Sequence, residues 1–290
     1  MASGPRPPDP GPPALQRDWT FVRSRPTLVA RLSRLKSRLT GRRPPPQYRA
    51  LKPVAPRPRW NAYFAYLPDA RLSPGHLFTI ERLRRLDGGL LVICATPGPA
   101  DVPEELRSMA DALYWKGLSG YDFSAYAIAL RAIAAHSPGA DAFVMNDSVL
   151  GPLVDPKPML DRAPWDLTAF TASSAVENHL QSYAFLLRGV TGERIAAFGS
   201  ALPERFAYDR FRDVVNLQET RFARLAARHM SVGAFFYADA ASLGDPSLAA
   251  AATLLEAGLP FLKKSLLGHY AGFQDEARLR AMLAAHGHPL

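Results

Sequence analysis

Three polar residues, Asn146, Asp147 and Ser148, directly follow an apolar run at 141–145 and carry the most distinctive chemistry of the chain. A carboxylate flanked by an amide and a hydroxyl supplies hard oxygen ligands. Such ligands suit Mg²⁺ or Mn²⁺ shared with a diphosphate, whose phosphates and waters complete the coordination. The same residues could instead form an Asx-type turn or a helix cap after a strand. Spacing alone leaves both alternatives open.

Two other polar segments are candidates for binding. In the segment 119–123, Asp122 could act as the N-cap of a following helix whose Phe123 and Tyr126 face the core. In the segment 179–182, His179 and Gln181 offer hydrogen-bond donors and acceptors, although a lone histidine is more often structural. Neither segment identifies a reaction by itself.

Several classes of protein are excluded by missing motifs. The chain contains no GxGxxG turn for a dinucleotide, no GxxxxGK[ST] loop, no GxSxG elbow and no HExxH pair. Its one cysteine, Cys94, excludes a disulfide framework and a cysteine-based zinc site, and fits a reducing compartment. No apolar run reaches the length of a membrane-spanning helix, and the first residues lack the apolar stretch of a signal peptide. We therefore expect a cytoplasmic protein.

The elements that must position these residues alternate between strands and helices. Patterns of apolar residues predict strands at 61–67, 90–96, 112–115, 141–145, 166–171 and 182–187, helices at 74–86 and 123–135, and mostly helices from 203 onward. This alternation predicts an α/β fold with a mostly parallel central sheet flanked by helices and a helical C-terminal part. Ligands of such sheets bind beyond the carboxyl ends of the strands, where 119–122 and 146–148 are expected to lie.

Charge and proline divide the chain at about residue 59. The 290 residues have a net charge of +9, yet residues 1–59 hold 14 Lys+Arg against two acids, and the remainder is slightly acidic. We therefore predict a basic, Pro/Arg-rich arm at 1–59 and a single domain at 60–290. In the arm, residues 1–14 are expected to be disordered. An amphipathic helix is expected at 26–41, with an apolar stripe of Leu28, Leu32, Leu35 and Leu39. A linker is expected to continue to about Pro58.

The arm has three possible roles. A short basic amphipathic helix suits an anionic membrane surface, which would place the protein on the inner face of the bacterial inner membrane. Alternatively, the arm is a solubilising tail whose leucines dock on its own body. Nucleic-acid binding is not expected, because no recognition module or aromatic platform accompanies the charge.

Five blocks in the body, in the right order, resemble the rhamnan synthesis protein F family of bacterial polysaccharide assembly. They are Gly120-Tyr121-Asp122-Phe123 with Ala125-Tyr126 (GYDFGAY in the family), Asn146-Asp147-Ser148 with Gly151-Pro152 (NDSxxGP), Asp166 with Thr171 (DFWGLT), His179-Leu180-Gln181-Ser182-Tyr183 (HLQSYF), and Gly258 to Leu267 (GxPFIKxELL). Together the blocks cover roughly residues 60–270. This chain departs from the pattern at Ser124, at 167–170 and at Ser265.

The resemblance implies a GT-A-like glycosyltransferase, which moves a sugar such as rhamnose from a dTDP-linked donor to a polysaccharide or lipid-linked glycan acceptor. It implies a metal site at Asp147, supported by Asn146 and Ser148. The nucleotide or sugar would be lined by Tyr121 and Asp122, and the donor sugar or acceptor by His179 and Gln181.

Three further residues are assigned on this basis. Lys263 or Lys264 would meet a phosphate, unless they are solvated lysines at a helix end. Glu219 would be the general base of an inverting transfer, unless it only stabilises the first turn of a helix. The alternative function is that of a non-catalytic scaffold in a glycan-assembly complex, docked at the membrane by the arm.

Overall fold

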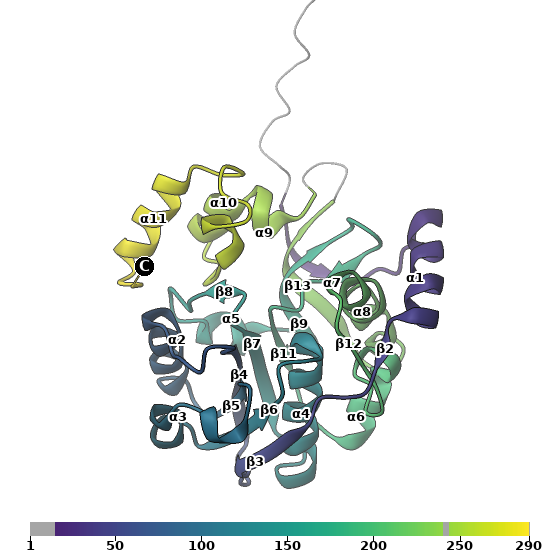
Figure 1. The fold of residues 1–290 in the computed structure, drawn as a ribbon. Coiled ribbons are helices and arrows are strands. Elements are labelled where there is room, and N and C mark those ends of the chain that lie inside the picture. Colours follow the sequence, from purple (N-terminus) through teal and green to yellow (C-terminus); the bar gives the residue numbers. More distant parts are fainter. Residues whose placement is uncertain (1–14, 240–243, 290) are drawn as a thin grey trace, which may run out of the picture.

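A ten-stranded mixed sheet forms the centre of the molecule (Figure 1). The computed structural model describes residues 15–239 and 244–289. The strand order is β1-β13-β9-β11-β7-β4-β5-β6-β3, with β10 paired to β9. The strands are β1 Gln16–Thr20, β3 Tyr48–Lys52, β4 Arg59–Tyr66, β5 Gly89–Ala95, β6 Ala112–Lys116, β7 Asp141–Asn146, β9 Leu167–Ser173, β10 His179–Leu180, β11 Ala184–Leu187 and β13 Val232–Ala238. The four central strands β6, β5, β4 and β7 are parallel, as predicted.

Helices cover both faces of the sheet. They are α1 Leu28–Thr40, α2 Pro74–Arg84, α3 Glu104–Met109, α4 Tyr121–His136, α5 Lys157–Arg162, α6 Gly192–Ala197, α7 Phe211–Val214, α8 Thr220–Ala226, α9 Pro246–Ala249, α10 Ala251–Glu256 and α11 Glu276–Ala285. Between α7 and α8 lies a π-helical turn, η3 (Val215–Glu219). Helices α4, α6 and α8 pack on one face, and α2, α3 and α5 pack on the other (Figure 1).

The central strands are buried on both faces, which explains their continuous apolar runs. In β4, Trp60, Ala62 and Phe64 belong to the core beneath α4, whereas Tyr63 and Ala65 belong to the core beneath α2. This alternation follows from the two-residue period of a strand. The predicted strands and helices between residues 60 and 190 are therefore confirmed, with small shifts at their ends.

The carboxyl ends of β4 and β7 lie side by side, because Phe64 pairs with Asn146. The antiparallel strand β11 begins at the same edge, where Asn146 N donates to Tyr183 O over 3.0 Å. One edge of the sheet therefore collects the residues after β4, after β7 and before β11.

Residues 15–59 belong to the same fold as the rest of the chain, which corrects the expected arm. Strand β1 pairs with β13, and β3 pairs with β6 where a linker was expected. Trp19 is buried and stacks on Tyr237 with ring centroids 4.4 Å apart. These edge strands are short and mostly exposed, so no apolar pattern marked them. Residues 1–14, predicted to be disordered, lie outside the described residues.

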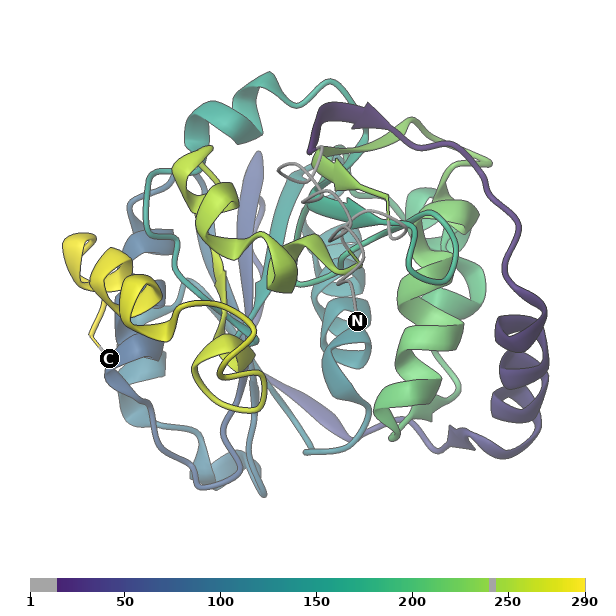
Figure 2. The same cartoon turned by 90° about the horizontal axis from the view of Figure 1, so that it is seen from above.

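The C-terminal part is less purely helical than expected. Val232–Ala238 forms strand β13, which runs parallel to β9. Two short ribbons flank the main sheet: β14 (Leu262–Lys263) pairs with β8 (Val149–Leu150), and β12 (Ala207–Tyr208) pairs with β2 (Arg42–Arg43). Seen from above, α9, α10 and α11 lie over one end of the sheet (Figure 2). None of the helices within 15–239 and 244–289 is both long and apolar enough to cross a membrane.

Candidate active site

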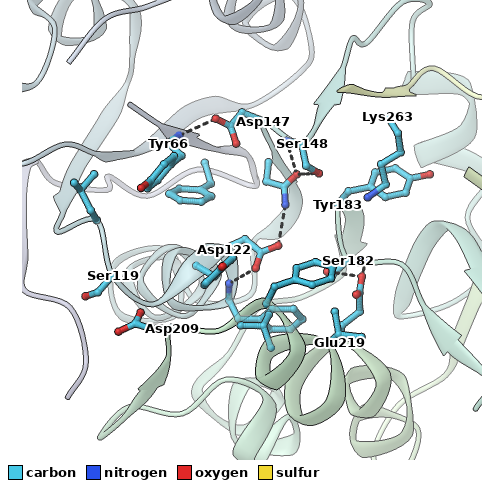
Figure 3. Close-up of a pocket in the computed structure, with 18 residues that line it drawn as sticks. Tyr66, Ser119, Asp122, Asp147, Ser148, Ser182, Tyr183, Asp209, Glu219 and Lys263 are labelled. Atoms are coloured by element: carbon cyan, nitrogen blue, oxygen red, sulfur yellow. Dashed lines mark hydrogen bonds between the residues drawn. The ribbon is translucent and has the colours of Figure 1, made fainter. Parts of the chain in front are cut away.

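A pocket of about 710 Å³ opens at the carboxyl edge of the sheet (Figure 3). Seven of the ten site residues predicted from the sequence line it: Tyr121, Asp122, Asn146, Asp147, Ser148, Glu219 and Lys263. Four of the five resembling blocks contribute to the lining, although the first and the last of them are far apart in the sequence. The prediction that polar residues after the strands would meet is confirmed.

Asp147 points into the pocket from the end of β7. Its Oδ2 atom accepts a hydrogen bond from the backbone N–H of Tyr66 over 2.9 Å and lies 3.5 Å from His76 Nε2. The other ring nitrogen of His76 accepts from the backbone of Ser73 over 3.1 Å, which holds the imidazole in place. Two elements beyond its own strand therefore hold the carboxylate.

The turn after β7 is stabilised by Asn146 rather than by Asp147. Asn146 Oδ1 accepts from the backbone N–H of Ser148 over 3.0 Å and from the Ser148 hydroxyl over 2.6 Å. Asn146 makes the Asx-type turn that was one of the two alternatives, and Asp147 is directed to the pocket. Asn146 and Ser148 bond to each other, so they shape the loop around Asp147.

The polar side chains around Asp147 limit how a metal could be held. Across the described residues, no three His, Cys, Asp or Glu side chains gather closely enough to hold an ion by themselves. A single carboxylate still suits Mg²⁺, which keeps several waters and takes its other ligands from substrate phosphates. Asp147 meets this requirement, because both of its contacts fall on one oxygen. The residues present therefore fit a metal that is bound together with a substrate.

Asp122 lies in the first turn of α4 and does not act as its N-cap. The N-cap is Gly120, whose φ of 87° lies in the left-handed region and whose added Cβ would lie 2.7 Å from Ser124 Oγ. Two residues after this N-cap, Asp122 Oδ2 accepts from Asn146 Nδ2 over 2.9 Å. This bond links the first and second resembling blocks. Burial, together with the nearby Glu219 carboxylate, raises the pKa of Asp122 to about 6.

Glu219 reaches the pocket from the π-helical turn η3. Its Oε1 atom accepts from both the backbone N–H and the hydroxyl of Ser182, each over 3.0 Å. Ser182 is held in turn by Tyr126, whose hydroxyl donates to its carbonyl over 2.9 Å. Ser182 therefore fixes the orientation of the Glu219 carboxylate. These contacts go beyond the alternative in which Glu219 only stabilises the first turn of a helix.

Lys263 and Lys264 diverge. Lys263 lines the pocket, and its ammonium lies 4.7 Å from the centre of the Tyr183 ring. Lys264 is exposed, and its backbone N–H donates to Ser148 O over 2.9 Å. The pairing of β14 with β8 puts Lys263 beside the turn that follows β7.

His179 and Gln181 are buried outside the pocket lining. The Nδ1 atom of His179 lies 2.7 Å from the carbonyl of Glu177. Gln181 accepts from the Thr171 hydroxyl over 2.6 Å and donates to Asp245 over 2.7 Å. These contacts connect β9, β10 and the segment before α9. The structure therefore places both residues behind the site, where they support its walls.

Two residues that the sequence analysis missed belong to this region. Asp209 lines the pocket and accepts a short hydrogen bond from the backbone N–H of Gly120. Lys116 is fully buried behind it and donates to Ser119 O over 2.8 Å. Burial lowers the pKa of Lys116 to about 8, although Asp122 and Asp209 oppose this shift. Lys116 is the last residue of the apolar strand β6, and this position could have indicated a residue near the ligand-binding edge. No sequence pattern around Asp209 indicates that it lies in the pocket.

The pocket has an acidic character. Asp122, Asp147, Asp209 and Glu219 line it, against Lys263 as the one cationic side chain in the lining. Aromatic residues supply apolar surface, including Phe64, Tyr66, Tyr121, Tyr183 and Phe211. Such a site can accept hydrogen bonds from a hydroxyl-rich ligand and pack against flat rings. It attracts cations, so a diphosphate would need a cation to bind there.

A family model described as rhamnan synthesis protein F matches residues 90–285. Among solved structures, TarS of S. aureus is similar with a TM-score of 0.36 and 13% identity, over 79% of this chain and 42% of that one. TarS 1–349, alone and in complex with UDP, gives TM-scores of 0.35 and 0.34 at 12% identity, over 78% of this chain and 70% of that one. This chain thus spans less than half of the first TarS structure. No curated protein matches the chain.

Proposed function

Because the chain belongs to the rhamnan synthesis protein F family, we propose that it is a GT-A-like glycosyltransferase of bacterial polysaccharide assembly. It would transfer a sugar from a nucleotide-sugar donor to a polysaccharide or lipid-linked glycan acceptor. The observation that carries the proposal is the acidic, aromatic-lined pocket at the carboxyl edge, where ligands of α/β sheets bind. The family description leads us to propose rhamnose as the sugar and dTDP as its carrier.

We assign the metal site to Asp147, with Asn146 and Ser148 shaping the turn that presents it. A bound Mg²⁺ or Mn²⁺ would neutralise the negative charge that develops on the departing nucleoside diphosphate. The excess of carboxylates in the pocket supports this assignment, because without a cation they would repel the diphosphate.

The remaining residues bind the donor and move the proton. Lys263 would donate to a phosphate oxygen, and Tyr121 and Asp122 would line the nucleotide or sugar. Glu219 would accept the proton of the attacking acceptor hydroxyl, because Ser182 holds its carboxylate toward the pocket. The pKa of Asp122, raised to about 6, keeps a fraction of this carboxyl group protonated near neutral pH, which lowers its repulsion with Glu219.

The decisive experiment is a nucleotide-sugar panel assay with a Mg²⁺ and Mn²⁺ titration. Wild-type protein is expected to transfer or hydrolyse one donor, and Asp147→Asn to lose roughly 10²-fold or more in rate while it stays folded. The matched control is Asp101→Asn, at an exposed carboxylate elsewhere. Full activity of Asp147→Asn would remove this residue from the mechanism. Absence of both turnover and donor-dependent thermal stabilisation would favour the non-catalytic scaffold.

We also propose that the N-terminal segment contacts an anionic membrane surface through α1. Leu28, Leu32 and Leu35 lie on one face of this helix and are 71, 63 and 55% exposed, while Ala30 and Arg34 face the body. The leucines therefore do not dock on the protein, contrary to the tail hypothesis; the side chain of Leu39 lies outside the described residues. Exposed leucines flanked by basic residues suit the interface of an anionic bilayer.

A vesicle flotation assay tests this contact. Truncation of residues 1–59 is unsuitable because it removes β1 and β3 from the sheet. Instead, Leu32→Ser combined with Leu35→Ser is expected to weaken binding to phosphatidylglycerol vesicles by roughly tenfold or more. Phe273→Ser, at an apolar side chain that is 60% exposed, is the control. Equal binding by wild type and the double variant would rule the contact out.

A further inference from the structure

A second cavity, of about 570 Å³, lies beside α1 and shares no lining residue with the active-site pocket. Its walls are α1, the segment 23–26 before this helix, and α8. Six of its eight lining residues are arginines: Arg23, Arg25, Arg31, Arg34, Arg38 and Arg224. This composition is the opposite of that of the active-site pocket.

The floor of the cavity is a buried ion network. Arg34 is only 5% exposed, and its Nε atom donates to the carbonyl of Asn216 over 3.0 Å. Its guanidinium makes a short ion pair with one oxygen of Glu177 and donates to the Thr220 hydroxyl over 2.8 Å. The other oxygen of Glu177 lies 3.2 Å from Arg224. One carboxylate thus orients two arginines from two different helices.

The walls are held by further bonds. The Oγ atom of Ser24 accepts from the backbone N–H of Asn178 over 2.6 Å, and the Asn178 side chain donates to Val22 O over 2.8 Å. These bonds fasten the segment before α1 to the loop that carries Glu177. Because Arg31, Arg34 and Arg38 are spaced by three and four residues, they share one face of α1. The arginines are therefore presented by fixed backbone elements.

Positive charge in the cavity is far from balanced. The six arginines face the single carboxylate of Glu177, which leaves a formal excess of five charges. In the part of the chain that the structure describes, Arg23, Arg25, Arg31 and Arg38 have no acidic side chain within ion-pair distance. Burial and the neighbouring Arg38, Arg224 and Arg34 lower the pKa of Arg221, behind the cavity, to about 10. An anion in the cavity would relieve this repulsion.

We propose that this cavity binds a phosphomonoester or diphosphate group, at a site separate from the active-site pocket. Guanidinium groups form paired, charge-assisted hydrogen bonds with phosphate oxygens, and several forks around one cavity favour a doubly charged anion. Two sources share this chemistry. One is a lipid headgroup, because the cavity flanks the exposed leucines of α1. The other is a soluble phosphorylated compound.

The test uses the full chain and two probes, inorganic pyrophosphate in calorimetry and phosphatidylcholine vesicles with or without phosphatidic acid in flotation. Arg31→Gln combined with Arg38→Gln changes two exposed rim residues, so folding is expected to persist. The control is Arg84→Gln combined with Arg85→Gln, which lowers the net charge equally at two exposed positions, the last residue of α2 and its C-cap.

The cavity variant is expected to lose roughly tenfold or more in pyrophosphate affinity, as for the loss of two charge-assisted donors, while the control keeps it. If phosphatidic acid recruits wild type but not the cavity variant, the source is a lipid headgroup. If only pyrophosphate separates the two proteins, the source is soluble. Equal binding by wild type and the cavity variant for both probes, or an equal loss in the control, overturns the proposal. Wild-type turnover does not enter these readouts, so a failed glycosyltransferase assay leaves the test intact.

Discussion

The active-site pocket and the arginine cavity differ in how the fold builds them. Carboxylates of the pocket come from segments next to strand ends and from a π-helical turn, and they are held by backbone N–H groups and by Ser182. Guanidinium groups of the cavity come from α1, from the segment before it and from α8, and two of them, Arg34 and Arg224, share Glu177. An acidic site needs a cation before it receives a diphosphate, whereas the arginine site receives a phosphate directly. Under the two proposals, one chain would bind the same chemical group in two opposite ways.

Loss of the Glu219 carboxylate should have the strongest effect, and it should change catalysis without changing the arginine cavity. Glu219→Gln should lower the rate of sugar transfer by roughly 10²-fold or more, because a positioned general base contributes that much. Donor-induced thermal stabilisation should remain, since an amide still accepts from Ser182. Pyrophosphate affinity at the arginine cavity should not change. Turnover close to wild type would exclude Glu219 as the base.

A second, smaller effect compares two adjacent lysines. Lys263→Ala should raise the KM for the nucleotide sugar roughly tenfold, because it removes the one cationic side chain of the pocket lining. Lys264→Ala is the matched control, because its side chain is exposed and only its backbone contacts Ser148. Steady-state kinetics of both variants give the two KM values. Equal KM values would mean that Lys263 only packs on Tyr183.

The acidic character of the pocket also predicts a pH effect on stability. The pKa of Asp122 is about 6 in the folded protein against an ordinary value of 3.8, so its ionised form destabilises the folded state. This cost is absent below about pH 4 and complete above about pH 6. Asp122→Asn should therefore raise the free energy of unfolding at pH 7.5 by roughly 1–3 kcal/mol.

The gain should vanish near pH 4, where both proteins are uncharged at this position. Denaturant unfolding at the two pH values measures it. The Glu219 carboxylate and the Lys263 ammonium must be present in both proteins, because they influence the same pKa in opposite directions. A variant that is less stable than wild type at pH 7.5 would contradict the assignment.

The smallest expected effect is in the arginine cavity itself. Arg31→Gln combined with Arg38→Gln should leave the rate of sugar transfer to a soluble acceptor within about twofold of wild type. These side chains do not line the active-site pocket. Transfer assays with saturating donor provide the measurement. A large loss of rate would mean that the two regions are coupled, and it would contradict the proposal that they are separate sites.

Much of the site was predictable because its residues directly follow apolar runs that were predicted as strands. Apolar runs that are buried on both faces identified β4, β5 and β7, and the polar residues after β7 then had to lie at a ligand-binding edge. The sequence did not predict that Asn146 closes the turn while Asp147 points into the pocket, because either side chain can close such a turn. The same holds for His179 and Gln181, whose donors and acceptors are used inside the wall.

Three features follow from local patterns in the sequence: the alternation of strands and helices, the edge at which polar residues gather, and the amphipathic pattern of α1. Local periodicity records which faces are apolar, and it requires no knowledge of distant partners. Three other features come from long-range packing: β1 and β3 join the sheet, Ser182 contacts Glu219, and the leucines of α1 point outward. Each of these depends on pairing between segments far apart in the chain. For α1, Arg34 pairs with Glu177 and Ser37 donates to Asp213, so this face of the helix docks on the body while the leucines stay exposed.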